Sequence, residues 1–296
     1  MRWRLKKIYS GTQFFNELDM LEIRLETMSP YVDYFVISES VRTHAGNPKP
    51  LFYKENQDRY KRFHNKIIHQ IVDHTPLVYD DLTKIKPLND IHEHIIHNIR
   101  NAYWLNPVEH IAFIRDAYEK ECISLALEGA ADDDIIIIGD LDEIPRPEAL
   151  EAVLKDFNPN ENYLFQNEMF YMYLNLQKVN EPWWGVNVLS VENMLYSSIS
   201  KIRQFKEGKR IGYGGWHFTY MGGEKAIIQK LESFSHQEFN NPQNKANVKM
   251  IVEHVKEMGL DALGRPSQFL LRDIRDGTFP QYVVDNTDKF EKYILK

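Results

Sequence analysis

The stretch DDDIIIIGDLDEIPRP, residues 132–147, places four isoleucines directly before a group of carboxylates. A fully apolar run of this length is typical of a strand covered on both faces, as in the parallel sheets of α/β proteins. Three acids, Asp140, Asp142 and Glu143, then follow Gly139 within four positions. In an open α/β sheet, ligands bind in the crevice beyond the carboxyl ends of the strands. The stretch therefore predicts a buried strand that ends at a ligand-binding edge.

The segments around this stretch alternate between strand-like and helix-like patterns. Apolar residues at helical spacing predict an amphipathic helix over 14–28, with its charges outward, and a second helix over 106–129. The runs at 32–40 and 66–72, rich in Val, Ile, Phe and Tyr, predict strands. This order predicts an α/β fold with a mostly parallel central sheet flanked by helices. Because no repeat or linker marks a boundary, we expect residues 1–296 to form a single domain.

Composition narrows the class of protein. The chain is 43% hydrophobic and 27% charged, which is the balance of a globular protein, and its net charge of -7 argues against a nucleic-acid partner. A single cysteine, Cys122, excludes an internal disulfide and fits a reducing compartment. The sequence contains neither a signal-peptide pattern nor a run of ~20 apolar residues. We therefore expect a cytoplasmic protein with no membrane span.

The two aspartates of the motif predict a metal site. Alternation beyond the strand turns Leu141 toward the core and both carboxylates toward the crevice. Carboxylates held this close repel each other unless a cation neutralises them, and hard oxygen ligands favour Mg²⁺ or Mn²⁺. The alternatives are a solvated acidic loop, or a cap for the helix that the residues at 145–154 predict. Three acids directly after a buried strand favour the metal.

Two enzyme classes place Asp-x-Asp after an apolar strand. In haloacid-dehalogenase-like phosphatases the first Asp is the nucleophile, and Thr or Val usually stands two residues after the second Asp, where this chain has Ile144. In nucleotide-sugar glycosyltransferases of the GT-A type, the motif binds a divalent ion that bridges the diphosphate of the donor, and it lies well inside the chain. The position near mid-chain favours the second class.

Several segments together resemble glycosyltransferase family 17, whose animal members are β-1,4-mannosyl-glycoprotein 4-β-N-acetylglucosaminyltransferases. They are LEIRL (21–25), VDYFVISES (32–40), GNPKPL (46–51), DDIIIIGDLDEIP (133–145) and GWHFTYMGG (215–223). The resemblance implies a GT-A-like (Rossmann-like) fold and an inverting transferase. It implies a UDP-sugar donor, with UDP-GlcNAc the first candidate, a glycan or other carbohydrate acceptor, and Mn²⁺ or Mg²⁺ as cofactor. It does not carry over the N-glycan acceptor of the animal members.

Four residues are candidates for binding the nucleotide-sugar: Glu39, Arg115, Asp140 and Leu141. Glu39 ends a predicted strand where a GT-A fold commonly holds the base or the ribose, although a plain strand-end acid is equally compatible. Arg115 could balance the diphosphate charge, or it could be a surface arginine paired with Glu119. We expect Asp142 to contact the metal directly, and Asp140 to act on the ribose or through a water.

Later segments supply the other candidates. Trp183 and Trp184, adjacent indoles in a predicted loop, could offer a flat face to an acceptor sugar or pack in the core. His217 is either a satisfied core histidine or, as the family resemblance favours, a ligand that joins Asp140 and Asp142 in the metal shell. Gly222 and Gly223 open a predicted helix.

The general base is expected among the acids that follow the metal motif. They are Glu181, Glu224, Glu232 and Glu238. Glu238 is preferred and Glu224 is the second choice, against the alternative that Glu238 is a solvated acid near a helix end. A second class of function also fits the same residues, namely a metal-dependent carbohydrate-binding protein without catalysis.

Overall fold

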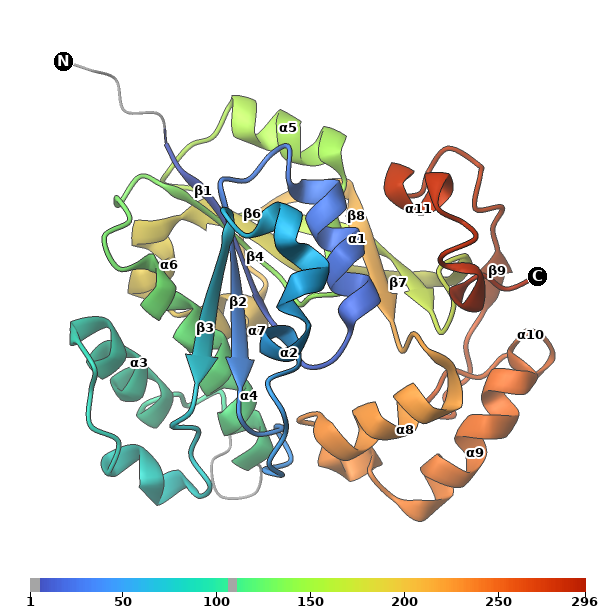
Figure 1. Ribbon diagram of the computed structural model, residues 1–296, viewed down its shortest axis with the longest axis horizontal. Helices are drawn as coiled ribbons and strands as arrows, with labels where there is room; N and C mark the ends of the chain where they lie inside the picture. The colour runs from blue at the N-terminus through green and yellow to red at the C-terminus, as the bar shows by residue number, and fades with distance from the viewer. Residues whose placement is uncertain (1–5, 106–110) are drawn as a thin grey trace.

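A computed structural model describes residues 6–105 and 111–296, and within them nine strands form one sheet (Figure 1). The strands follow one another across the sheet in the order β3-β2-β1-β4-β7-β6-β8-β5, and β9 pairs with β7. Their bounds are β1 Ile8–Gln13, β2 Tyr34–Ser40, β3 Ile67–Val72, β4 Ile135–Ile138, β5 Glu143–Pro145, β6 Tyr163–Tyr171, β7 Leu176–Ser190, β8 Lys209–Thr219 and β9 Phe269–Leu271.

The helices alternate with the strands in the first half of the chain. Their bounds are α1 Leu18–Met28, α2 Phe52–Asn56, α3 Asp90–Arg100, α4 Ile111–Glu121, α5 Pro147–Lys155, α6 Val191–Ser197, α7 Ile199–Phe205, α8 Gly223–Ser233, α9 Pro242–Glu253, α10 Val255–Met258 and α11 Gln281–Asp285. The helix expected over 14–28 is α1. The helix expected over 106–129 is α4 followed by the 3₁₀ helix Cys122–Leu127, and its residues 106–110 lie outside the described residues. In the described parts of the chain, no helix has the length and apolar character needed to cross a bilayer.

The predicted α/β class is confirmed, and the parallel pairing is concentrated in one half of the sheet. Strands β3, β2, β1 and β4 pair in parallel, as the sequence predicts. Strand β7 then runs antiparallel to both β4 and β6, and β8 returns parallel to β6. The link from β6 to β7 is only residues 172–175. Such a short connection joins antiparallel neighbours, because a parallel pair needs a crossover of a dozen or more residues.

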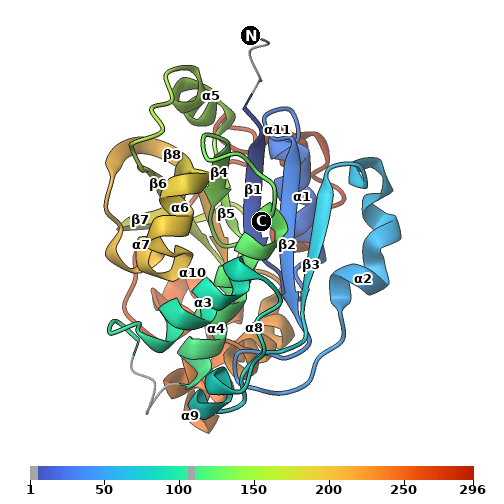
Figure 2. The same ribbon diagram turned by 90° about the vertical axis from the view of Figure 1, so that its left-hand side faces the viewer.

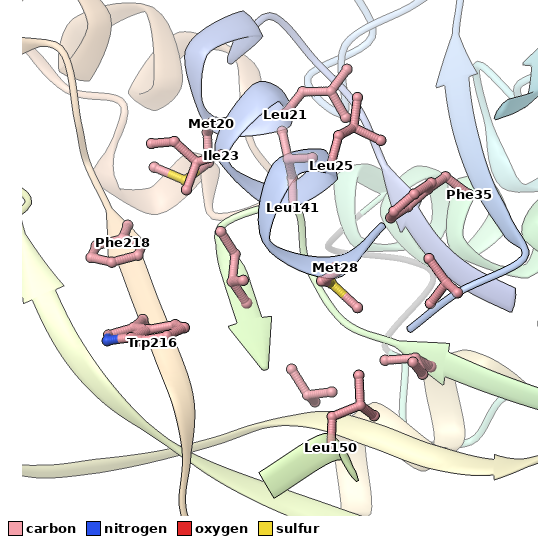
Figure 3. Packing of buried hydrophobic residues seen from close by; sticks show 14 of the residues in the cluster. Met20, Leu21, Ile23, Leu25, Met28, Phe35, Leu141, Leu150, Trp216 and Phe218 are labelled. Carbon is pink, nitrogen blue, oxygen red and sulfur yellow. The ribbon is translucent and has the colours of Figure 1, made fainter. Parts of the chain in front are cut away.

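The isoleucine run is apolar throughout because both of its faces are covered. Ile135 and Ile137 pack into the core that contains α1, whereas Ile136 and Ile138 pack into the core that contains α6 and α7. Figures 1 and 2 show these helices on the two sides of the sheet. Figure 3 shows the first core, where α1 side chains such as Leu21 and Leu25 lie near Phe35. Burial of each such side chain contributes ~1.5–3 kcal/mol.

The order of the parallel strands creates a switch point at β1. The chain passes from β1 through α1 to β2 on one side, and β4 later joins β1 on its other side. Crossover helices on opposite faces leave a crevice at the carboxyl ends of two such strands. Residues 139–142 follow β4 directly, so the motif lies at this crevice, as predicted from the sequence.

Candidate active site

A cavity of about 770 Å³ opens at the carboxyl ends of the parallel strands. Its floor is formed by the motif residues 140–142 and by Gln13, the last residue of β1. Helix α4 contributes Asp116 and Lys120 to its walls. Further wall residues come from distant elements, namely Trp183 of β7, Arg203 of α7, His217 of β8 and Lys230 of α8.

The motif itself alternates as expected. Leu141 is buried in the core beneath α1, where Figure 3 shows it among the α1 side chains. Asp140 and Asp142, on either side of it, both line the cavity. The alternation places a hydrophobic anchor between two cavity-facing carboxylates, so the depth of the motif is fixed by packing.

A buried arginine holds the backbone of the motif. The Arg24 guanidinium of α1 donates to the carbonyl oxygens of Asp140 (3.1 Å) and Glu143 (2.7 Å) and to the Ser10 hydroxyl (3.1 Å). Burial lowers the pKa of Arg24 to about 10. The expectation that α1 turns its charges outward is wrong here, because Arg24 has no exposed surface. Hydrogen bonds to backbone carbonyls compensate for its burial. Helical spacing alone does not predict these carbonyl partners.

Glu143 forms the centre of a second buried network. Its carboxylate accepts from both terminal nitrogens of Arg203 (2.7 and 2.9 Å), from the Trp183 indole N–H (2.5 Å) and from the Asp140 backbone N–H (2.9 Å). The Arg203 guanidinium also donates to Asp140 Oδ2 at 2.9 Å and to the carbonyl oxygen of Gly185. The third acid of the motif thus ties α7 and β7 to the cavity floor.

Each cavity-facing aspartate has cationic neighbours. Asp140 lies 2.9 Å from Arg203 and 3.6 Å from Lys120, whereas Asp142 lies 3.5 Å from His217 and 3.6 Å from Lys230. Burial raises the pKa of both carboxyls, but these cations outweigh it and hold each pKa below its usual value. Burial lowers the pKa of His217, and Asp142 more than reverses this shift. Both aspartates are therefore carboxylates at neutral pH.

Two side chains, Asp142 and His217, are placed to act as protein ligands of a metal ion. Within the described residues, no group of three or more His, Cys, Asp or Glu side chains could hold an ion. Asp142 Oδ1 and His217 Nε2 lie 3.5 Å apart, a separation that fits two ligands of one ion. Mg²⁺ in phosphate sites is commonly held by one or two carboxylates together with substrate phosphates and water. The pair fits such an ion when His217 is in its neutral form, with the remaining positions left to a phosphate ligand and water.

The sequence of the whole chain matches one family. The model of glycosyltransferase family 17 matches residues 1–81 and 73–295. The chain belongs to glycosyltransferase family 17. Two relatives, from Rattus norvegicus and Homo sapiens, carry the name β-1,4-mannosyl-glycoprotein 4-β-N-acetylglucosaminyltransferase and are each 20% identical over 98% of this chain. The match covers 55% of each relative, so the chain spans about half of their length.

Solved structures show more distant similarity. TarS 1–349 of S. aureus matches 85% of this chain with 72% of its own, at 7% identity and a TM-score of 0.36. The galactosyltransferase LgtC, solved with donor and acceptor sugar analogs, matches 82% of each chain at 12% identity and a TM-score of 0.31.

Two residues expected to bind the donor lie away from the cavity of this family 17 chain. Glu39 is fully buried, and its carboxylate accepts from the Tyr53 backbone N–H (3.0 Å) and contacts His69 Nε2 (2.8 Å). The Arg115 guanidinium donates to three backbone carbonyls, those of His44, Pro76 and Leu77. Neither side chain is among those that line the cavity. The Glu39 carboxylate is engaged by residues of α2 and β3, and the Arg115 guanidinium by loop carbonyls.

The tryptophan pair lies in strand β7, so the expected loop is wrong. Consecutive residues of a strand point to opposite faces. Trp183 lines the cavity, packs 4.9 Å from the His217 ring and has the Lys206 ammonium 4.1 Å above it. Trp184 is not among the cavity-lining residues and lies under the Arg210 guanidinium, 4.7 Å away. The structure thus brings only the first indole to the site.

The four candidate bases are also separated. Glu181 lines the cavity, with its carboxylate 2.5 Å from Lys178. Glu224 is an exposed residue in the first turn of α8, which begins at Gly223 as the glycine pair predicts. Glu238 is exposed and lies 2.7 Å from His236 Nδ1. The cavity-lining residues do not include Glu224, Glu232 or Glu238.

The sequence predicts neither the cations of this site nor the partners of its buried acid, Glu143. Lys120, Arg203 and Lys230 come from three helices, and no local pattern marks them. The burial of Arg24 could be recognised from the sequence. This arginine lies inside the apolar stripe of LEIRL and not on the outward, charged face of the predicted helix. The sequence shows Glu143 in the motif, but its partners are residues 183 and 203, which are distant along the chain.

Proposed function

We propose that residues 1–296 act as a single-domain, inverting glycosyltransferase that transfers N-acetylglucosamine from UDP-GlcNAc to a carbohydrate acceptor. The observation that carries this proposal is the position of Asp140 and Asp142 at the carboxyl end of β4, on the floor of the cavity, in a member of glycosyltransferase family 17. The choice of N-acetylglucosamine rests on the names of the relatives. Family membership also favours transfer over the phosphatase alternative.

The cavity residues divide into roles under this proposal. Asp142 and His217 would hold Mn²⁺ or Mg²⁺, which would supply positive charge to the diphosphate leaving group. Asp140 and Leu141 would line the donor side, with Asp140 kept ionised by Arg203 and Lys120. Trp183 would contact the acceptor, since its side chain is among those that line the cavity. Aromatic faces of this kind pack on the apolar side of sugar rings.

Direct displacement also needs a base on the acceptor side, opposite the departing diphosphate. Glu181 is the one of the four candidate acids that lines the cavity, so we now place the base there, ahead of Glu238 and Glu224. Its side chain is 45% exposed and therefore accessible to a bound acceptor.

Release of UDP from UDP-GlcNAc in the presence of Mn²⁺ tests the proposal, with and without a panel of sugar acceptors. Asp142→Asn should lower turnover at least tenfold at limiting Mn²⁺ and raise the Mn²⁺ concentration needed, because it weakens one of two protein ligands. Asp133→Asn, at a side chain that is 61% exposed, is the matched control and should leave turnover unchanged. Normal turnover of Asp142→Asn at limiting Mn²⁺ would contradict the metal assignment.

The same assay separates transfer from the second class of function. A metal-dependent carbohydrate-binding protein would bind sugar in the presence of Mn²⁺ but would release no UDP from UDP-GlcNAc, even over long incubation. Slow hydrolysis of the donor without an acceptor is expected only of a transferase.

A further inference from the structure

Two lysines approach the motif from two separate helices, α4 and α8. Lys120 Nζ lies 3.6 Å from Asp140 Oδ1, and Lys230 Nζ lies 3.6 Å from Asp142 Oδ2. Both side chains line the cavity, and they are 17% and 30% exposed. Figures 1 and 2 show α4 and α8 near the end of the sheet where β2 finishes. Each aspartate of the motif therefore has one ammonium beside it.

The third cation beside the two aspartates, Arg203, already has a full set of acceptors. Its two terminal nitrogens carry four hydrogens. They meet four acceptors, which are both oxygens of Glu143, Oδ2 of Asp140 and the carbonyl oxygen of Gly185. To bind an anion through these nitrogens, Arg203 would have to release Asp140 or Glu143. Its geometry is that of a positioning residue.

The lysines differ from Arg203 in their free hydrogen-bonding capacity. An ammonium has three hydrogens. Lys120 lies 2.9 Å from Asp116, and its 3.6 Å approach to Asp140 is too long for a hydrogen bond. Lys230 lies 3.4 Å from the Thr219 hydroxyl and 3.6 Å from Asp142. Each ammonium therefore keeps hydrogens that a ligand in the cavity can use.

We propose that Lys120 and Lys230 bind the diphosphate of the nucleotide-sugar directly, so that part of the affinity for the donor does not depend on a metal ion. This inference rests on the proposed function, and it adds two donor-binding residues to that site. A diphosphate carries negative charge on neighbouring groups, and two ammoniums, one beside each aspartate of the motif, match it. The aspartates hold the ammoniums over the cavity without occupying all of their hydrogens.

Calorimetric titration of the full chain with UDP and with uridine, in EDTA and in Mn²⁺, tests the proposal. In EDTA the wild type should still bind UDP. Lys230→Met and Lys120→Met should each weaken UDP binding roughly tenfold to hundredfold, the usual worth of a hydrogen bond to a charged group. Uridine binding should not change. Lys225→Met, at an exposed lysine of the same helix α8, is the control and should bind UDP as the wild type does.

The outcomes separate the two proposals. Two results would contradict the role of the lysines while leaving UDP-GlcNAc as the proposed donor. In the first, the wild type binds UDP in Mn²⁺ but not in EDTA; in the second, both lysine variants bind UDP normally. If the wild type binds UDP in neither condition, the proposed donor is overturned, and the lysine assignment with it. Thermal unfolding identifies any variant that fails to fold. Should Lys120→Met unfold because Asp116 loses its partner, Lys230→Met decides.

Discussion

Replacing Arg203 with methionine should destabilise the fold, because it leaves a buried carboxylate without its cation. The Glu143 side chain has no exposed surface, and both of its oxygens accept from Arg203. Removing one partner of a buried ion pair costs about 3–5 kcal/mol. The Trp183 indole and the Asp140 amide still donate to Glu143 in the variant, so we expect a loss near the lower end, about 3 kcal/mol.

Urea denaturation measures this loss as a change in the free energy of unfolding. Lys249→Met is the matched control, because its side chain is 63% exposed and its ion-pair partner Glu253 is 54% exposed, so the pair lies at the surface. Such pairs contribute about 0–1 kcal/mol. The double variant Glu143→Gln with Arg203→Met should cost less than the sum of the single variants, since the uncompensated charge is gone. A loss below about 1 kcal/mol for Arg203→Met, or additive costs, would refute the reasoning.

Three further predictions follow from the same contacts. Gly185→Ala should lower stability by ~1–3 kcal/mol in thermal unfolding, because its Cβ would lie 2.6 Å from the Glu143 carboxyl carbon, whereas Gly212→Ala, with 3.8 Å to its nearest neighbour, should be harmless; equal effects would refute the clash. Burial raises the pKa of Asp19 and Glu22, but bonds to Lys292 and Lys289 outweigh it and lower each pKa below its ordinary value of 3.8 or 4.5. These groups therefore stabilise the fold above pH ~4.5 and lose this contribution as the pH falls, so Glu22→Gln should flatten the acid side of the stability profile; an unchanged profile would be contrary. Glu181→Gln should reduce transfer by roughly 10²–10⁴ while UDP still binds, and Glu238→Gln should not; the reverse result would return the base to Glu238.

The sequence predicts most reliably what is encoded over a few neighbouring residues. The isoleucine run specifies β4 because each face needs its own apolar residues, and the alternation past Gly139 specifies which motif side chains reach the cavity. Prediction fails where a local pattern has two meanings. Pro182 and Gly185 suggest a loop around the tryptophans, but β7 continues through them, because its partner strand β6 pairs with Trp183 and Trp184.

Partners from distant segments account for the remaining errors. Glu39 does end a strand, as expected, but a backbone N–H and His69 from β3 take its oxygens. Arg115 is on the helix where the sequence places it, but three loop carbonyls bind its guanidinium. Position along the chain predicts which edge of the sheet a residue reaches. Only the tertiary structure decides whether its charge is still available to a ligand.

Net charge gives a similar contrast between the whole chain and the site. A net charge of -7 would oppose the approach of an anion such as a diphosphate, and the motif adds two carboxylates at the point of binding. Nearby cations offset this negative charge, because α4, α7 and α8 each bring one cation to within 3.6 Å of these carboxylates. A screened surface charge acts weakly beyond ~10 Å, so the groups that line the cavity dominate the field that a bound ligand meets. The net charge of the chain therefore does not exclude an anionic ligand at this cavity, where three helices place cations beside the motif.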